Sequence, residues 1–304
     1  MTLDLDPTTP TGVDRVLQLP GALNLRDVGG YPAAGGRRVR GRTLLRSAAM
    51  HGLGDEARAA LAAIPVRTVV DLREDAEVSH EPNALDGLAV TTRRIPIFST
   101  GTVLPPPPST PSVTGQEAGP AGASAPGSAP GSAPGSAPGS GAAVADGALA
   151  AQAAGAGITL SDIYDFILDG RGERLAAVVA TLAEPGRLPA IVHCSAGKDR
   201  TGLTIMLLLD LLGVPDEIIA ADYAITASLL GAEAQAALTR LTVATAGDRE
   251  VPRDLLASPP ELILRALAKV RASHGGARGY LLAHGATADQ LDTLVAALTE
   301  QATG

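Results

Sequence analysis

One cysteine and no tryptophan occur among the 304 residues of this chain, and aromatic side chains make up only 2% of it. A single cysteine excludes a disulfide bond within the chain. The scarcity of aromatic rings means that a hydrophobic core has to be built from alanine, leucine, valine and isoleucine. The histidines other than His193 show no metal-ligand spacing, and the chain has no second cysteine that could complete a metal site. Neither a metal nor another cofactor is therefore expected.

Positive charge is also scarce. The chain has 24 lysines and arginines against 32 acidic residues, which gives a formal net charge of −8. This surplus of negative charge argues against nucleic acid as a partner.

Long hydrophobic runs are missing as well. Residues 1–7 are acidic and have neither the basic start nor the apolar stretch of a signal peptide. The apolar stretch 203–212 is interrupted by Asp210 and is far shorter than the roughly 20 residues that cross a bilayer. We expect no stable membrane insertion and a cytoplasmic location, with secretion that does not use a classical signal peptide as the alternative.

Hydrophobic residues, at 45%, still suffice for a sizeable core. The exception is the segment 101–159, which consists almost entirely of Ala, Gly, Pro, Ser and Thr and repeats the tetrad Ala-Pro-Gly-Ser four times between Ala125 and Ser140. Such a segment has too little apolar side-chain area to offset the entropy lost on ordering. We therefore expect a flexible N-terminus over 1–15 and a single domain over 16–304, interrupted by a disordered insertion over 101–159.

Strand and helix patterns alternate on both sides of this insertion. Apolar runs predict buried strands over 66–72 and 88–97, and Asp55 is placed to cap a short helix over 55–64. Beyond the insertion, a helix is expected to start at Ser161.

Only helices are expected towards the C-terminus. Ser258 with Glu261, and Thr287 with Gln290, have the spacing of capping boxes at helix starts. Strands and helices followed by a helical C-terminal part indicate an α/β fold with a central sheet covered by helices.

The most informative segment is 193–202, with the sequence HCSAGKDRTG. Residues 188–192 before it read as a short buried strand, and residues 201–212 as an apolar helix. A loop that closes onto a helix start directs its backbone N–H groups inward, and with the positive end of the helix dipole they form an anion site. The residues expected to bind phosphate are Ser195, Ala196, Gly197, Lys198, Asp199 and Arg200.

Three side chains of this segment suit covalent chemistry on phosphorus. The planar fork of Arg200 matches two phosphate oxygens at once. Cys194 lies in the same positive field, which favours its thiolate, and a thiolate is a nucleophile at neutral pH. Attack on phosphorus would give a phosphocysteine, and the hydroxyl of Thr201 is placed to hydrogen-bond the sulfur when it leaves in the second step.

The C-x5-R pattern from Cys194 to Arg200 resembles the signature of cysteine-dependent phosphatases, and the fuller run resembles bacterial protein tyrosine phosphatases. The other stretches similar to this family are 24–31, 45–47, 70–73 with Glu77, 221–223 and 258–294. The resemblance implies a dual-specificity-phosphatase-like fold, with the loop at the carboxyl end of a strand in a mostly parallel sheet. In that family the region of the insertion holds helices that can lid the site, so the insertion is either a gate or a neutral spacer.

The resemblance implies hydrolysis of phosphotyrosine proteins through a phosphocysteine intermediate. Two alternatives stay open: a phosphoinositide or broad-specificity phosphatase with the same mechanism, and a non-catalytic binder of phosphorylated ligands. Arsenate reduction, which uses a similar loop, is disfavoured because it needs further thiols.

The general acid is the least defined residue. Phe98, Ser99 and Thr100 directly follow 95–97, where many cysteine phosphatases place an acidic residue. Asp199 is therefore the first candidate, and Asp71 and Asp27 are the alternatives. Asp199 could instead only shape the loop. Asp71 and Asp27, together with Arg73 and His193, are expected to support the site, with His193 orienting the loop by hydrogen bonds to backbone carbonyls.

Substrate choice depends on the basic residues. Lys198 adds positive charge beside the phosphate, as in phosphoinositide phosphatases. Five further cations occur within ten residues: Arg37, Arg38, Arg40, Arg42 and Arg46. They either receive a polyphosphorylated headgroup or form a solvated turn.

Overall fold

The computed structural model describes residues 15–99, 158–246 and 258–302. The predicted flexible N-terminus and the predicted insertion lie almost entirely outside these residues. At their edges, Arg15 is buried with its guanidinium carbon 3.7 Å from the centre of the Tyr31 ring, and Ile158 is buried in the core. Both residues are therefore packed against the folded domain.

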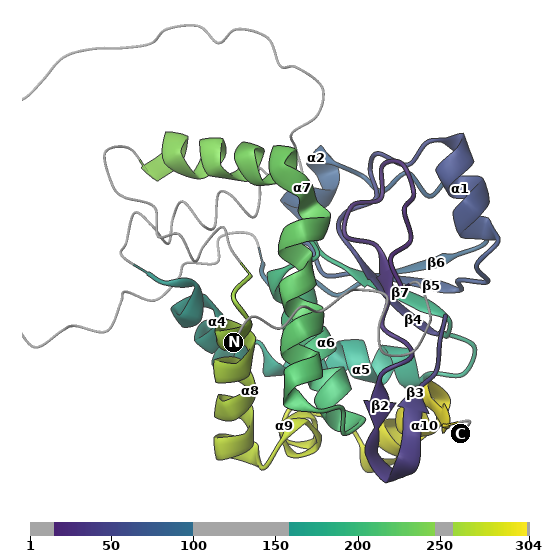
Figure 1. Cartoon of the computed structure of the whole chain (residues 1–304), viewed down its shortest axis with the longest axis vertical. Coiled ribbons are helices and arrows are strands. Elements are labelled where there is room, and N and C mark those ends of the chain that lie inside the picture. Colours follow the sequence, from purple (N-terminus) through teal and green to yellow (C-terminus); the bar gives the residue numbers. More distant parts are fainter. Residues whose placement is uncertain (1–14, 100–157, 247–257, 303–304) are drawn as a thin grey trace, which may run out of the picture.

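A five-stranded sheet forms the centre of the molecule (Figure 1). In spatial order its strands are β1 (Arg26–Asp27), β4 (Leu44–Ser47), β7 (Ala190–His193), β5 (Thr68–Asp71) and β6 (Thr91–Arg94). Only β1 pairs antiparallel, so the prediction of a mostly parallel sheet is confirmed. Ser47 and Asp71 flank His193 in register, which puts the start of the loop at the middle of the carboxyl edge of the sheet.

Helices account for most of the remaining described chain. They are α1 (Asp55–Ala62), α2 (Asp75–His80), α4 (Leu160–Gly170), α5 (Gly172–Ala183), α6 (Asp199–Leu211), α7 (Asp216–Ala246), α8 (Pro260–His274), α9 (Ala277–Ala283) and α10 (Ala288–Leu298). The last three confirm the predicted helical C-terminal part, but the expectation of helices alone there is wrong, because a short strand, β8 (Thr299–Gln301), follows α10. None of the helices in the described ranges is long and apolar enough to cross a membrane.

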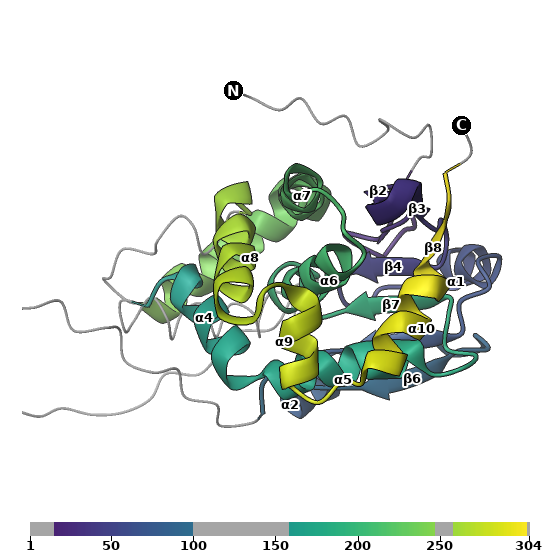
Figure 2. The same cartoon turned by 90° about the horizontal axis from the view of Figure 1, so that it is seen from below.

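The alternation of side chains along the buried strands produces two cores. Ile191 of β7 and Val69 of β5 face the smaller core, which α1 covers, whereas Val192 and Val70 face the larger core under α4, α5, α6 and the C-terminal helices. Successive strand residues point to opposite faces, so near-continuous apolar strands fit a sheet covered on both sides. Figure 2 shows the larger helical layer from a second direction.

The outer strand differs from its prediction. The strand expected over 88–97 is limited to β6, and all of its residues are exposed because it forms an edge of the sheet.

Helix starts also differ from the predictions. The capping box of Thr287 with Gln290 is confirmed. The expected box of Ser258 with Glu261 is wrong, because α8 begins at Pro260 with no side-chain cap. Asp55 is the first residue of α1 rather than its cap, and α4 begins one residue before Ser161.

A second, small sheet lies at the far end of α6 from the loop. Its strands are β2 (Pro32–Ala33), β3 (Arg37–Val39) and β8 (Thr299–Gln301), and a short 3-10 turn (Ala34–Gly36) joins the first two. The N–H of Ala34 donates to the carbonyl oxygen of Leu212 at 3.0 Å, just past the end of α6. Since α6 has 13 residues, this sheet and the loop are separated by about 20 Å.

Candidate active site

The segment that carries the cysteine turns sharply between β7 and α6. Cys194 is fully buried, and α6 begins at Asp199, two residues before the predicted start. Gly197 has a φ of +68°, and a Cβ atom there would lie 2.3 Å from the carbonyl oxygen of Ser47. Only glycine fits this turn, because both the left-handed backbone and the close approach exclude a side chain.

Two side chains from the first part of the chain bind the carbonyls on the outside of the turn. Asn24 Nδ2 donates to the carbonyl oxygens of Ala196, at 3.0 Å, and Gly197, at 3.1 Å. The guanidinium of Arg46 donates to the Gly197 oxygen at 2.8 Å.

The preceding carbonyls are held in the same way. The N–H of Ala49 donates to the Ser195 oxygen at 2.8 Å, and Nδ1 of His193 donates to the Cys194 oxygen at 3.0 Å. In a trans peptide the N–H points away from the C=O. Bonding the carbonyls of 194–197 from outside therefore directs the N–H groups of 195–198 towards the inside of the loop, as an anion site requires.

A buried charge network fixes these donors. The carboxylate of Asp222 in α7 accepts three hydrogen bonds. The donors are Nε of Arg26 at 3.2 Å, a terminal guanidinium nitrogen of Arg46 at 2.5 Å and the Tyr31 hydroxyl at 3.1 Å. Burial alone would raise the pKa of Asp222, but Arg26 and Arg46 outweigh it and lower the pKa to about 2. Arg26 also donates to Oδ1 of Asn24. Asn24 and Arg46 are thus oriented by one buried carboxylate.

Arg200 is held by a carboxylate from another element. Its two terminal nitrogens donate to Glu77 of α2 at 2.6 and 2.8 Å, and the hydroxyl of Ser195 donates to the same carboxylate. Burial by itself would raise the pKa of Glu77, but the Arg200 guanidinium lowers it below its ordinary value. Glu77 is therefore ionised and fixes the plane of the predicted phosphate-binding fork beside the loop.

Asp71 and Arg73 form a third buried pair beneath His193. Arg73 donates to both oxygens of Asp71, at 2.9 Å from Nε and 2.7 Å from a terminal nitrogen. Burial by itself would raise the pKa of Asp71, but His193, when it is protonated, and Arg73 outweigh it and lower the pKa. At neutral pH the carboxyl is ionised and Arg73 is its charged partner.

His193 is neutral in this setting, because burial lowers its pKa more than Asp71 raises it. Nδ1 carries the proton that is donated to the Cys194 oxygen, and Nε2 accepts from Asn83 Nδ2 at 3.0 Å. The expectation that His193 binds a loop carbonyl matches this contact.

Asp199 lies on the open side of the loop. Its side chain is 17% exposed, and Oδ1 accepts from the Tyr164 hydroxyl at 2.8 Å and lies 3.6 Å from Nζ of Lys198. The hydroxyls of Tyr164 and Tyr223 are 2.8 Å apart. Burial and the nearby Asp199 raise the pKa of Tyr164 well above its usual value, so its hydroxyl stays protonated and able to donate.

The two other acid candidates are placed differently. Asp71 is buried in its pair with Arg73, and Asp27 accepts from the backbone N–H groups of Gly29, at 2.8 Å, and Arg42, at 2.6 Å. Asp27 therefore supports the turn into β4 at the opposite end of that strand from the loop.

Thr201 lies in the first turn of α6 and is fully buried. Its hydroxyl has no hydrogen-bond partner among the described residues, so the contact expected with the cysteine sulfur is not formed in this structure.

Six residues that hold the loop or Asp199 were missing from the sequence-based list of site residues. They are Asn24, Arg26, Arg46, Glu77, Tyr164 and Asp222. Most of them belong to the stretches that carry the family resemblance, which was the available signal. Nothing in the sequence says which of them touch.

This chain is similar in sequence to known proteins. A model of the tyrosine phosphatase family matches residues 17–300. The triple specificity protein phosphatase PtpB of Mycobacterium tuberculosis (strain ATCC 25618 / H37Rv) is 29% identical over 211 residues, which cover 68% of this chain and 68% of that protein. A tyrosine-protein phosphatase of Nostoc commune is 37% identical over 113 residues, which cover 34% of this chain and 37% of that protein.

Proposed function

This chain belongs to the tyrosine phosphatase family, whose members hydrolyse phosphoric monoesters, and we propose that it dephosphorylates phosphotyrosine proteins through a phosphocysteine on Cys194. The observation that supports this best is the loop itself. Its carbonyls are bonded from outside by Asn24, Arg46, Ala49 and His193, so its N–H groups are directed to where a phosphate would bind.

In the first step, the Cys194 thiolate attacks phosphorus. The S–P bond forms while the bond to the tyrosyl oxygen breaks, and Asp199 gives its proton to that oxygen. The loop N–H groups and Arg200 stabilise the charge on the equatorial phosphate oxygens, and Glu77 keeps the guanidinium in place for this.

In the second step, water attacks the phosphocysteine and the ionised Asp199 accepts its proton. The S–P bond breaks, and the thiolate and inorganic phosphate are released. We assign the Thr201 hydroxyl to the departing sulfur, since a buried hydroxyl that lacks a partner among the described residues is available for it.

Asp199 suits the role of general acid better than the alternatives do. Its carboxyl is partly exposed at the loop, whereas Asp71 is buried in its pair with Arg73 and Asp27 binds backbone groups away from the loop. Tyr164 and Lys198 both contact Oδ1, so the proton for the leaving group is assigned to Oδ2.

Phosphotyrosine is favoured over a lipid headgroup as the substrate. Arg38 and Arg40 pair with Glu300 in the small sheet, far from the loop, and do not support a headgroup site. The name of the mycobacterial relative attributes three specificities to that protein. Parallel assays on phosphotyrosine peptides and phosphoinositides therefore define which substrates this chain accepts.

Metal-free hydrolysis of an aryl phosphate by the wild type and by Cys194→Ser tests the mechanism. The variant should lose turnover but still bind vanadate or phosphate, because binding uses the loop backbone and Arg200. If the serine variant keeps more than a few per cent of the wild-type rate, the covalent mechanism is wrong. If the wild type itself shows no turnover, the protein is a non-catalytic binder of phosphorylated ligands.

A leaving-group series tests the acid. Asp199→Asn should slow phenyl and alkyl phosphates much more than activated aryl phosphates, whose leaving oxygen needs no proton. Equal slowing of all substrates would mean that Asp199 only shapes the loop.

A further inference from the structure

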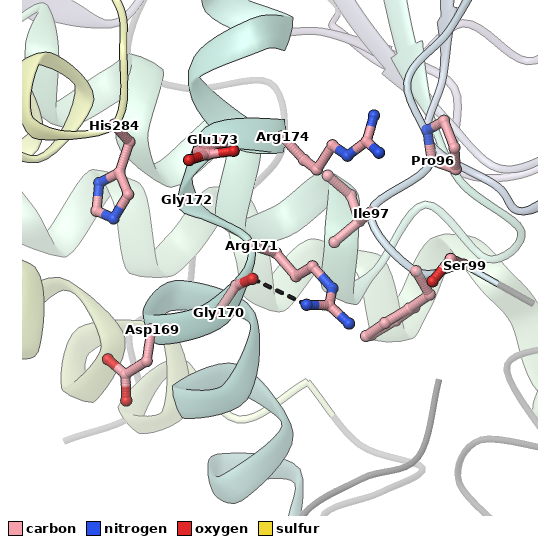
Figure 3. Close-up of a pocket in the computed structure, with 11 residues that line it drawn as sticks. Pro96, Ile97, Ser99, Asp169, Gly170, Arg171, Gly172, Glu173, Arg174 and His284 are labelled. Carbon is pink, nitrogen blue, oxygen red and sulfur yellow. Dashed lines mark hydrogen bonds between the residues drawn. The ribbon is translucent and has the colours of Figure 1, made fainter. Parts of the chain in front are cut away.

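A cavity of about 370 Å³ lies beside the loop, where residues 96–99 pass the junction of α4 and α5 (Figure 3). Its lining includes Ile97, Phe98 and Ser99 from the first segment and Arg171 and Arg174 from the second. None of the residues assigned to catalysis lines it, so it is separate from the phosphate site.

The charged groups of the cavity are segregated. Figure 3 shows the guanidinium groups of Arg171 and Arg174 on the side of Ile97 and Ser99, whereas Glu173, Asp169 and His284 lie on the other side. Asp169 is already paired with Nζ of Lys269 at 2.7 Å. The positive end of the α5 dipole, at Gly172, adds to the two guanidinium charges.

A row of rings links this positive region to the catalytic loop. The guanidinium carbon of Arg200 lies 5.6 Å from the centre of the Phe98 ring, and Phe98 stacks on Phe166 with centres 6.3 Å apart. Arg171 lies over the other ring, with its guanidinium carbon 4.8 Å from the Phe166 centre. Phe98 is buried and Phe166 is only partly exposed, so the two cationic sites are connected by packed aromatic rings, of which Phe166 reaches the surface.

We infer that this cavity is a second anion subsite, which receives the carboxylate of an aspartate or glutamate near the phosphotyrosine in a polypeptide substrate. The inference rests on the proposed function and extends it to substrate sequence. The distances from Arg200 to Phe98, to Phe166 and on to Arg171 are 5.6, 6.3 and 4.8 Å, and together they set the largest possible separation of the two guanidinium groups. About five residues of extended chain span that separation, at roughly 3.3 Å per residue.

A polypeptide fits this arrangement better than an inositol headgroup does. An extended peptide can lay an apolar group on the partly exposed ring of Phe166 while its phosphate and its carboxylate occupy the two ends. An inositol ring is polar on all sides and carries its phosphates on neighbouring carbons, so it has no group suited to the apolar ring of Phe166.

Paired phosphotyrosine peptides test the subsite. One set carries a single Glu at each of the five positions on either side of the phosphotyrosine, and the matched set carries Gln there. At one or two positions the wild type should prefer Glu by about five- to tenfold in kcat/KM, the scale of one or two partly exposed ion pairs.

Arg174→Glu should abolish or reverse that preference. Its turnover of a small aryl phosphate, which cannot reach the cavity, should be unchanged. The matched control is Arg278→Glu, which reverses an exposed charge on α9 outside the cavity and should keep the preference.

Each other outcome is decisive. Turnover of both peptide sets without a Glu preference overturns the subsite but leaves the proposed function standing, whereas a wild type that hydrolyses no phosphotyrosine substrate overturns both. If Arg174→Glu impairs a soluble inositol bisphosphate but not the acidic peptides, the cavity serves a headgroup and the peptide assignment is wrong.

Discussion

The two ends of α6 are both rich in arginine, yet they use it in opposite ways. At the loop end, Arg26 and Arg46 are buried and share the carboxylate of Asp222. At the other end, Arg38 and Arg40 are substantially exposed and pair with Glu300 of β8. The sequence places most of these side chains in a single basic cluster.

The difference shows what buried charge does in this fold. A buried ion pair is often no more stabilising than apolar packing, because desolvation offsets the attraction. Around the loop, however, the charges hold Asn24 and Arg46 against carbonyls that would otherwise be free to rotate into the anion site. The exposed ion pairs at the far end only join two short strands, and such pairs contribute little to the free energy of unfolding.

The largest expected effect comes from breaking the buried network. Arg46→Met should lower the free energy of unfolding by about 3–5 kcal/mol, because it leaves Asp222 partly uncompensated in the core. The matched change at the far end, Arg38→Met, should cost no more than about 1 kcal/mol. Denaturant unfolding measures both, and equal losses would remove the distinction between the two ends.

The pH dependence of stability sharpens the same comparison. Because folding lowers the pKa of Asp222 from about 3.9 to about 2, its contribution is complete above pH 4 and is lost as the pH falls through 2. Asp222→Asn should be less stable than the wild type at pH 6, and the gap should narrow by about 2 kcal/mol towards pH 2. A constant gap over this range would show that the charge of Asp222 does not matter.

The smallest effect is expected at Asp199, whose carboxyl accepts from the neutral Tyr164 hydroxyl and lies beside Lys198 instead of an arginine. Tyr164→Phe removes the hydroxyl that donates to Asp199 and should slow substrates with poor leaving groups by about tenfold or less. Activated aryl phosphates should be hydrolysed at nearly the wild-type rate. A uniform loss for all substrates would instead indicate damage to packing.

Local patterns predicted the local structure well. The strand, loop and helix around Cys194, the mostly parallel sheet and the Thr287 cap follow from apolar runs and short-range spacing. The start at Pro260 was missed, because proline at a first helical position competes with the capping box suggested by Ser258.

Such local patterns could not predict which distant residues hold the catalytic loop. Glu77 meets Arg200 across 123 residues, and Asn24 meets Gly197 across 173 residues. No periodicity reports contacts over such separations. For the same reason, the cluster 37–46 could not be divided in advance between a buried role for Arg46 and an exposed role for Arg38.

The central claim is that Cys194 carries the phosphoryl group during turnover. The most direct measurement is intact-protein and peptide mass spectrometry of acid-quenched reactions with an activated aryl phosphate, in the wild type and in Cys194→Ser. The account predicts one added phosphoryl group on the peptide that contains Cys194, formed and lost on the timescale of turnover and absent from the variant. Turnover by the wild type without such a species, or with the phosphoryl group on another residue, would contradict it.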